Sequence, residues 1–151
     1  MSALPSPQVR VAAIITNSEG QVVCSKRLNS HGSGTWQLPG GHLEYGESFF
    51  ACTERKAGEE TGLGVRGVKV VAVTNSIFRE LGKHYVMIFV KCERMNKEAQ
   101  PQVMEPDKCG GWVWKTWDEL KKAKNGSDGD NELFLPLVRL LEEYPDIATL
   151  I

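Results

Sequence analysis

The apolar residues at the start of the chain are grouped in strand-like runs that are separated by polar turns. Val9–Ile15 is an apolar run rich in β-branched residues, and Gln21–Lys26 is a second run of the same kind. The turn residues Asn17–Gly20 lie between them, so the two runs are predicted to form a hairpin. A polar loop over Leu28–Thr35 follows, and Trp36–Leu38 leads out of it.

Two longer apolar runs lie in the middle of the chain. Val65–Phe78 and His84–Glu93 are predicted to be long strands, joined by the charged turn Arg79–Lys83. The remaining predicted elements are a polar loop (Met95–Gln102), an extended segment (Trp112–Trp114), a short helix (Asp118–Lys124), a flexible loop (Asn125–Asp130) and an amphipathic helix (Glu132–Glu143).

A helix of about fifteen residues is predicted between the first group of strands and the long strands. The segment Gly46–Ser48 has the composition of a helix start, and Gly62 is a typical stop. Gly40 and Gly41, further upstream, permit an unusual backbone turn that leaves main-chain carbonyls accessible.

Three charged residues share one face of this helix, because Lys56, Glu59 and Glu60 are three and four positions apart. Carboxylates crowded together repel one another unless a cation lies among them, and oxygen ligands suit Mg²⁺ or Mn²⁺. Taken alone, Glu59 and Glu60 fit an ordinary solvated helix face better than a metal site.

Length and charge restrict the function further. At 151 residues the chain suits one domain, predicted over residues 9–151 after a flexible N-terminus at 1–8. The 18 basic and 19 acidic residues give no electrostatic surface for a long nucleic acid, whereas a small nucleotide is compatible with this balance because a metal would meet its phosphates. No signal peptide and no apolar run of about 18 residues is found, so no membrane partner is expected.

The cysteines and histidines show no metal-ligand spacing. The cysteines are scattered, which favours free thiols in a reducing, cytoplasmic compartment over zinc or disulfides. The histidines are interpreted as ordinary loop or strand residues. These residues are Cys24, Cys52, Cys92, Cys109, His31, His42 and His84.

The segment Gly41–Leu63 resembles the signature of the Nudix hydrolases. The positions in register with that signature are Gly41, Glu47, Arg55, Ala57, Glu59, Glu60, Gly62 and Leu63. The exception is Lys56, where the family has glutamate. The segments that flank this signature, over roughly residues 9–141, resemble a small eukaryotic MutT-type subgroup.

This resemblance implies an α/β fold in which a mixed β-sheet is sandwiched between helices. It also implies a dimeric pyrophosphohydrolase of nucleoside triphosphates, including oxidised guanine nucleotides, that depends on Mg²⁺ or Mn²⁺. The metal would be held by the carbonyl of Gly41 and by Glu59, Glu60 and Glu105. Glu59 is the candidate catalytic carboxylate, while Glu47 and Arg55 would pair structurally.

Substrate contacts are expected from residues outside the signature. Phe134, Leu137 and Trp36 are candidates for a base slot, although Leu137 suits core packing better. Thr74 and Asn75 would offer polar contacts, and Arg27 or Lys26 would meet phosphate oxygens.

Lys56 leaves two main functions open. An ammonium group cannot ligate Mg²⁺, and Lys56 is expected to reach towards Glu60, one turn along the helix, and to fill part of the metal position. The chain is then either a hydrolase with reduced turnover or a nucleotide-binding module without hydrolysis. An unrelated structural domain would require every flanking similarity to be accidental.

Overall fold

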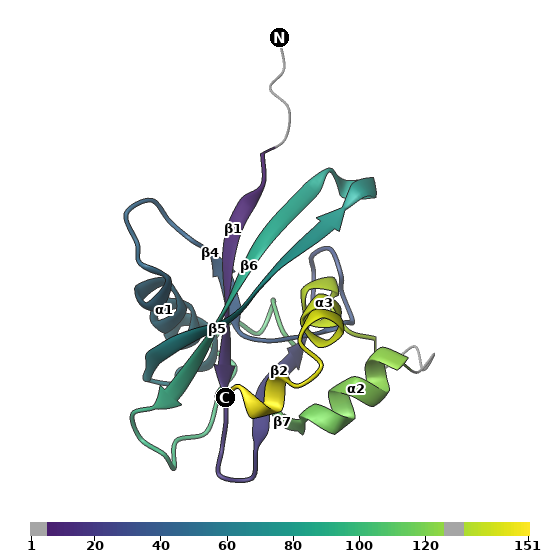
Figure 1. Cartoon of the computed structure of the whole chain (residues 1–151). Helices are drawn as coiled ribbons and strands as arrows, with labels where there is room; N and C mark the ends of the chain where they lie inside the picture. Colours follow the sequence, from purple (N-terminus) through teal and green to yellow (C-terminus); the bar gives the residue numbers. More distant parts are fainter. Residues whose placement is uncertain (1–5, 126–131) are drawn as a thin grey trace.

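The computed structural model describes residues 6–125 and 132–151, whose strands form two sheets (Figure 1). The four-stranded sheet has the order β4 (Gly40–His42), β1 (Gln8–Ile15), β6 (Lys83–Arg94) and β5 (Val65–Phe78). The three-stranded sheet has the order β3 (Trp36–Gln37), β2 (Gln21–Lys26) and β7 (Val113–Thr116).

The larger sheet is mixed, because β1 runs parallel to β6 and antiparallel to β4. β5 and β6 form the long hairpin that the sequence predicts, with the short 3₁₀ helix η1 (Arg79–Leu81) at its tip. Two register shifts interrupt their pairing near Gly67 and Val70. In Figure 1 this hairpin extends along β1 and curves over the rest of the domain.

The predicted hairpin of the first two strands is wrong, because β1 and β2 belong to different sheets. The two segments are joined by an isolated bridge between Thr16 and Val22 and by a hydrogen bond from the N–H of Asn17 to the carbonyl of Gln21. Asn17 closes the turn itself, since its Oδ1 accepts hydrogen bonds from the N–H groups of Glu19 and Gln21. The turn is therefore correct, but β2 finds its ladder partners in β3 and β7.

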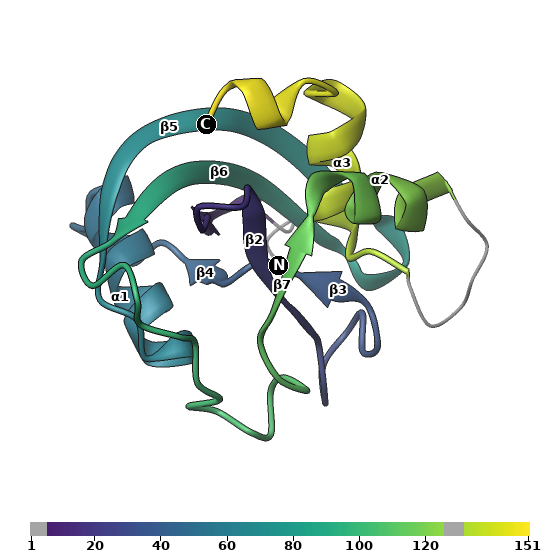
Figure 2. The same cartoon turned by 90° about the horizontal axis from the view of Figure 1, so that it is seen from below.

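Helices cover both faces of the larger sheet (Figure 2). α1 (Phe49–Thr61) packs on one face through a core that includes Val11, Ala13, Cys52 and Ala57. The opposite core joins α2 (Trp117–Asn125) and α3 (Leu135–Glu143) to Ala12, Ile14 and Phe89. Successive residues of β1 thus serve the two cores in turn, as strand periodicity requires. The sandwiched mixed sheet confirms the predicted fold class.

The last helix is shorter than predicted, because Glu132–Phe134 forms backbone hydrogen bonds with β3 instead of a helical turn. Trp36 N–H donates to the Glu132 carbonyl, and Phe134 N–H donates to the Trp36 carbonyl, both at 2.9 Å. Pro136 then occupies the first turn of α3, where a missing N–H costs nothing. A final 3₁₀ helix, η3, spans Ile147–Thr149.

The remaining expectations concern the short helix, the cysteines, the two flexible segments and the absence of a membrane span. The short helix is present as α2, and all four cysteines are buried and free. Most of the expected flexible loop, residues 126–130, and residues 1–5 lie outside the described part of the chain; Gln8 already belongs to β1. Within the described part, no helix is long and apolar enough to cross a membrane.

Candidate active site

The boundaries of α1 follow from the two residues that cap it. Ser48 accepts a hydrogen bond from the N–H of Ala51 through its side-chain oxygen, at 3.0 Å. Gly62 adopts a left-handed conformation, with φ of 72°, and its N–H returns to the carbonyl of Gly58. Glycine meets that conformation without a side-chain clash, so the helix ends there. The predicted start and stop are both confirmed.

Gly40 and Gly41 hold β4 close to both β1 and α1. A Cβ atom at Gly40 would collide with the main-chain oxygen of Val11, so no larger residue fits there. A Cβ at Gly41 would instead collide with Cε of Lys56 and lie 2.9 Å from its Nζ. The end of the lysine side chain therefore lies directly over Gly41, where the family resemblance places a metal ligand.

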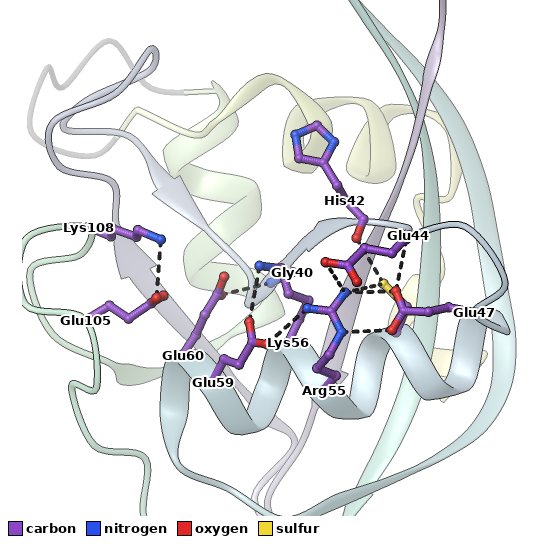
Figure 3. Close-up of polar contacts among 11 residues, drawn as sticks. Gly40, His42, Glu44, Glu47, Arg55, Lys56, Glu59, Glu60, Glu105 and Lys108 are labelled. Atoms are coloured by element: carbon purple, nitrogen blue, oxygen red, sulfur yellow. Dashed lines mark hydrogen bonds and ion pairs between the residues drawn. The ribbon is translucent and has the colours of Figure 1, made fainter.

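Arg55 and Glu47 form the structural pair that the sequence predicts (Figure 3). Nε and Nη2 of Arg55 each donate to a different oxygen of Glu47, at 2.8 Å. These hydrogen bonds lower the pKa of Glu47 to about 2 and raise the pKa of Arg55. The pair joins the helix to the loop after β4, because Glu47 Oε1 also accepts from the N–H of Glu44.

Glu59 lies between two cationic side chains. Nη1 of Arg55 donates to one carboxylate oxygen at 3.0 Å, and Nζ of Lys56 is 3.5 Å from the other. The hydrogen bond from Arg55 is the main cause of a lowered pKa for Glu59, with the charge of Lys56 adding to it. The expectation that Lys56 reaches Glu60 is therefore wrong: its ion pair is with Glu59, three residues away on the helix.

Glu60 is surrounded differently. Its Oε1 accepts from the N–H of Gly40 at 3.1 Å, and its main-chain carbonyl accepts from Nε1 of Trp112 at 2.9 Å. Burial, with a smaller contribution from the negative charge of Glu105, raises the pKa of Glu60 to about 7 in spite of the Gly40 hydrogen bond and the charge of Lys56. Glu105 is thus close enough for its charge to matter, although its own ion pair is with Lys108 at 3.2 Å.

The oxygen atoms of Glu59, Glu60 and Gly41 are of the kind that bind a divalent cation. Carboxylate and carbonyl oxygens are the ligands that Mg²⁺ prefers. Glu60 has no ion pair within the described residues, and the nearby charges of Lys56 and Arg10 do not cancel the effect of burial on its pKa. However, no three acidic, imidazole or thiol side chains gather as a metal-binding group in residues 6–125 and 132–151. Lys56 supplies a cation where the third carboxylate of the family would be.

A small cavity of about 30 Å³ lies beside Gly40 and Gly41, and three of the predicted substrate residues line it: Arg27, Phe134 and Leu137. The guanidinium carbon of Arg27 lies 3.9 Å from the centre of the Phe134 ring. Leu137 is also a core residue, with 2% of its surface exposed. Other residues around the cavity include Arg10, Gln37, Leu38, Met87 and Phe89.

Arg27 already has partners inside the protein. Three of its nitrogens donate to the carbonyl of His31, to Gln37 Oε1 and to Ser30 Oγ, at 2.8 to 3.0 Å. Burial lowers the pKa of Arg27. Its position beside the cavity agrees with a substrate role, but these bonds also fix the loop after β2, a role that the sequence did not reveal.

Thr74 and Asn75 do not line the cavity. Adjacent strand residues point to opposite faces of a sheet. Thr74 is buried, and its hydroxyl has no hydrogen-bond partner within the described chain. Asn75 is exposed and its Oδ1 lies 2.9 Å from Nε2 of His84. Trp36 is also absent from the cavity wall; Lys115 Nζ lies 4.3 Å above its ring.

Sequence reasoning missed Arg10 and His42, which form part of the same region. Nη1 of Arg10 lies 3.1 Å from Nε2 of His42, across the pairing of β1 with β4. A signal was available, because Arg10 is a lone charge within an apolar strand. Its partner could not be inferred without the sheet pairing.

The structure is a mixed α/β domain in which a loop, the helix α1 and a following loop carry Glu59 and Glu60 beside Gly40 and Gly41. The NUDIX domain family matches residues 6–136. The chain therefore belongs to the Nudix family.

Individual relatives agree with this assignment. An RNA pyrophosphohydrolase of Psychrobacter cryohalolentis is 38% identical over 80 residues, which are 52% of this chain and 44% of that protein. The chain thus spans less than half the length of this curated relative. A MutT Nudix hydrolase of Burkholderia pseudomallei has a TM-score of 0.65 at 27% identity, over 75% of this chain and 85% of that one.

More distant structures share the fold. The MutT protein of Methanosarcina mazei has a TM-score of 0.68 at 21% identity and covers 95% of this chain and 99% of its own. The Nudix domain of Shewanella oneidensis NrtR, solved with ADP ribose, has a TM-score of 0.68 at 16% identity, over 93% and 88% of the two chains.

Proposed function

We propose that this protein is a Nudix pyrophosphohydrolase that acts on nucleoside triphosphates, including oxidised guanine nucleotides, with turnover reduced by Lys56. The products would be a nucleoside monophosphate and pyrophosphate. The observation that carries this proposal is the grouping of Glu60, Glu59 and Gly41 at the end of α1, beside a cavity lined by Phe134. The similarity to pyrophosphohydrolases supports the reaction type.

Each acidic residue has a separate role in this proposal. Glu60 and Glu105, together with the carbonyl of Gly41, would hold the divalent cation. When bound, that cation would neutralise charge on the phosphate oxygens and lower the pKa of a water molecule. Glu59, kept ionised by its hydrogen bond from Arg55, would accept or orient the proton of the attacking water. The water oxygen bonds to phosphorus, and the phosphoanhydride oxygen leaves with pyrophosphate.

The second candidate function, a nucleotide-binding module without hydrolysis, is favoured by one specific contact. Lys56 pairs with the same carboxylate that would serve as base, and its side chain covers Gly41. A bound polyphosphate would meet an ammonium group there. In this case nucleotide affinity would persist without a divalent cation.

Two measurements on the same samples separate these functions. Pyrophosphate release is followed with a panel of ordinary and oxidised nucleoside triphosphates, in Mg²⁺ or Mn²⁺, and binding is followed by thermal shift. Release that is abolished by Glu59→Gln supports the hydrolase. Binding without release supports the module, while neither response to any nucleotide would contradict both. The expected homodimer stays a prediction that light scattering would test.

A further inference from the structure

A second and larger pocket lies on the other side of β4 from the acidic helix. Its volume is about 440 Å³, and its walls come from the start of β1, the loop after β2, β4 and the tip of the β5–β6 hairpin. Figure 3 shows the His42 ring pointing away from the carboxylates of α1. The charged and imidazole side chains around this pocket, called the basic pocket below, are Arg10, Arg27, His31, His42, Lys83 and His84.

The basic pocket collects all three histidines of the chain, and no acidic residue borders it within the described part. Arg10, Arg27 and Lys83 form no ion pair there with any described carboxylate. Arg10 instead stacks on the ring of Tyr85, with its guanidinium carbon 4.7 Å from the ring centre. Positive charge is therefore concentrated without a fixed counter-charge.

This excess of positive charge contributes to lowered pKa values of His31 and Arg27. Burial, together with the charges of Arg27, Lys83 and Arg10, lowers the pKa of His31 to about 4. Burial and then Arg10 also lower the pKa of Arg27, while the charge of Glu60 offsets a smaller part. An anion in the basic pocket would relieve this repulsion, because each cation would gain a nearby opposite charge.

The pocket also offers suitable donor groups. Nε2 of His31 lies 2.9 Å from the hydroxyl of Tyr85, and its buried Nδ1 has no partner within the described residues. Guanidinium and ammonium groups, here those of Arg10, Arg27 and Lys83, bind phosphate oxygens through charge-assisted hydrogen bonds. The volume falls in the range of roughly 300–1,000 Å³ that is typical of small-molecule sites.

We propose that the basic pocket binds a phosphate group, at a site distinct from the acidic end of α1. Two sources of that group fit the geometry. It is either a free anion such as pyrophosphate or the second phosphate of a nucleotide that extends from the basic pocket towards the small cavity. The latter is possible in space because Arg10 and Arg27 line both cavities.

Titration calorimetry with pyrophosphate, in a chelator that removes divalent cations, tests this inference without any hydrolysis. Lys83→Gln and Arg10→Gln are each expected to weaken binding by about five- to tenfold, as the loss of a charge-assisted hydrogen bond would. Lys69→Gln removes an equal charge from an exposed position on β5 outside the pocket and is the matched control. Lys83 is exposed at the hairpin tip, so its replacement leaves the core intact even if Arg10→Gln destabilises the fold.

The source of the phosphate is distinguished by comparing a nucleoside 5′-monophosphate with the corresponding 3′,5′-bisphosphate. A larger effect of Lys83→Gln on the bisphosphate identifies the second phosphate of a nucleotide, and an effect on pyrophosphate alone identifies a free anion. If Lys83→Gln and Arg10→Gln change the affinity for none of the three probes, the basic pocket is not a phosphate site. Because no step requires turnover, a failure of the proposed hydrolysis would leave this result standing.

Discussion

Replacing Lys56 by glutamate tests the function of the acidic site most directly. In the structure Lys56 Nζ lies 3.5 Å from Glu59, with 20% and 44% of the two side chains exposed. The substitution removes this ion pair and restores a carboxylate over Gly41. It also places three acidic residues on one helix face, which favours the binding of a divalent cation.

These contacts set the expected changes in the free energy of unfolding and in kcat. Because Glu59 is well exposed, the lost ion pair is worth no more than about 1 kcal/mol, and the new like-charge contacts add about 0.5 kcal/mol. Lys56→Glu should therefore lower the free energy of unfolding by about 1 kcal/mol without metal. A saturating cation at 100 times its Kd would restore about 2.7 kcal/mol. Freeing Glu59 from the ammonium group and adding a carboxylate ligand for the cation should raise kcat by at least about 100-fold.

The assay is pyrophosphate release from nucleoside triphosphates in Mg²⁺, with thermal unfolding of the same samples with and without the cation. Lys56→Gln separates loss of the lysine from gain of the carboxylate, and should fall between the two proteins. Lys69→Glu makes the same charge reversal at a distant exposed site and should resemble the unchanged protein. Equal turnover of Lys56→Glu and the unchanged protein would refute the role assigned to position 56.

Three further predictions address the rest of the site. Since the pKa of Glu47 is lowered to about 2 from 4.5, its stabilisation is complete above pH 4.5 and is lost as the pH falls towards 2; urea unfolding should show the deficit of Glu47→Gln at pH 7 disappearing over that range. Gly40→Ala should cost about 3 kcal/mol because backbone opposes the new Cβ, whereas Gly41→Ala, opposed by the flexible end of Lys56, should cost less than half of that in the same unfolding assay. Leu137→Ala should cost about 2–5 kcal/mol in denaturant unfolding, and a cost below 1 kcal/mol would contradict its core position.

Local features of the sequence determined the elements that position the site. Ser48 and Gly62 fix the two ends of α1, because an N-cap hydroxyl and a left-handed glycine act through the nearest residues. The resemblance to the Nudix signature likewise implied the pairing of Arg55 with Glu47, and the apolar runs indicated the long β5–β6 hairpin. Such features depend on contacts close in sequence or on a motif of fixed spacing.

Contacts between distant segments were decided only by the tertiary structure. The hairpin predicted for β1 and β2 failed because strand partners are chosen by competition among all strands, and β6 pairs with β1. Lys56 pairs with Glu59, while the N–H of Gly40 donates a hydrogen bond to the carboxyl group of Glu60. This second contact joins residues that are 20 positions apart. The basic pocket unites residues from β1, the loop after β2, β4 and β6 that share no sequence pattern. Its concentration of charge exists only once the sheet has brought those segments together.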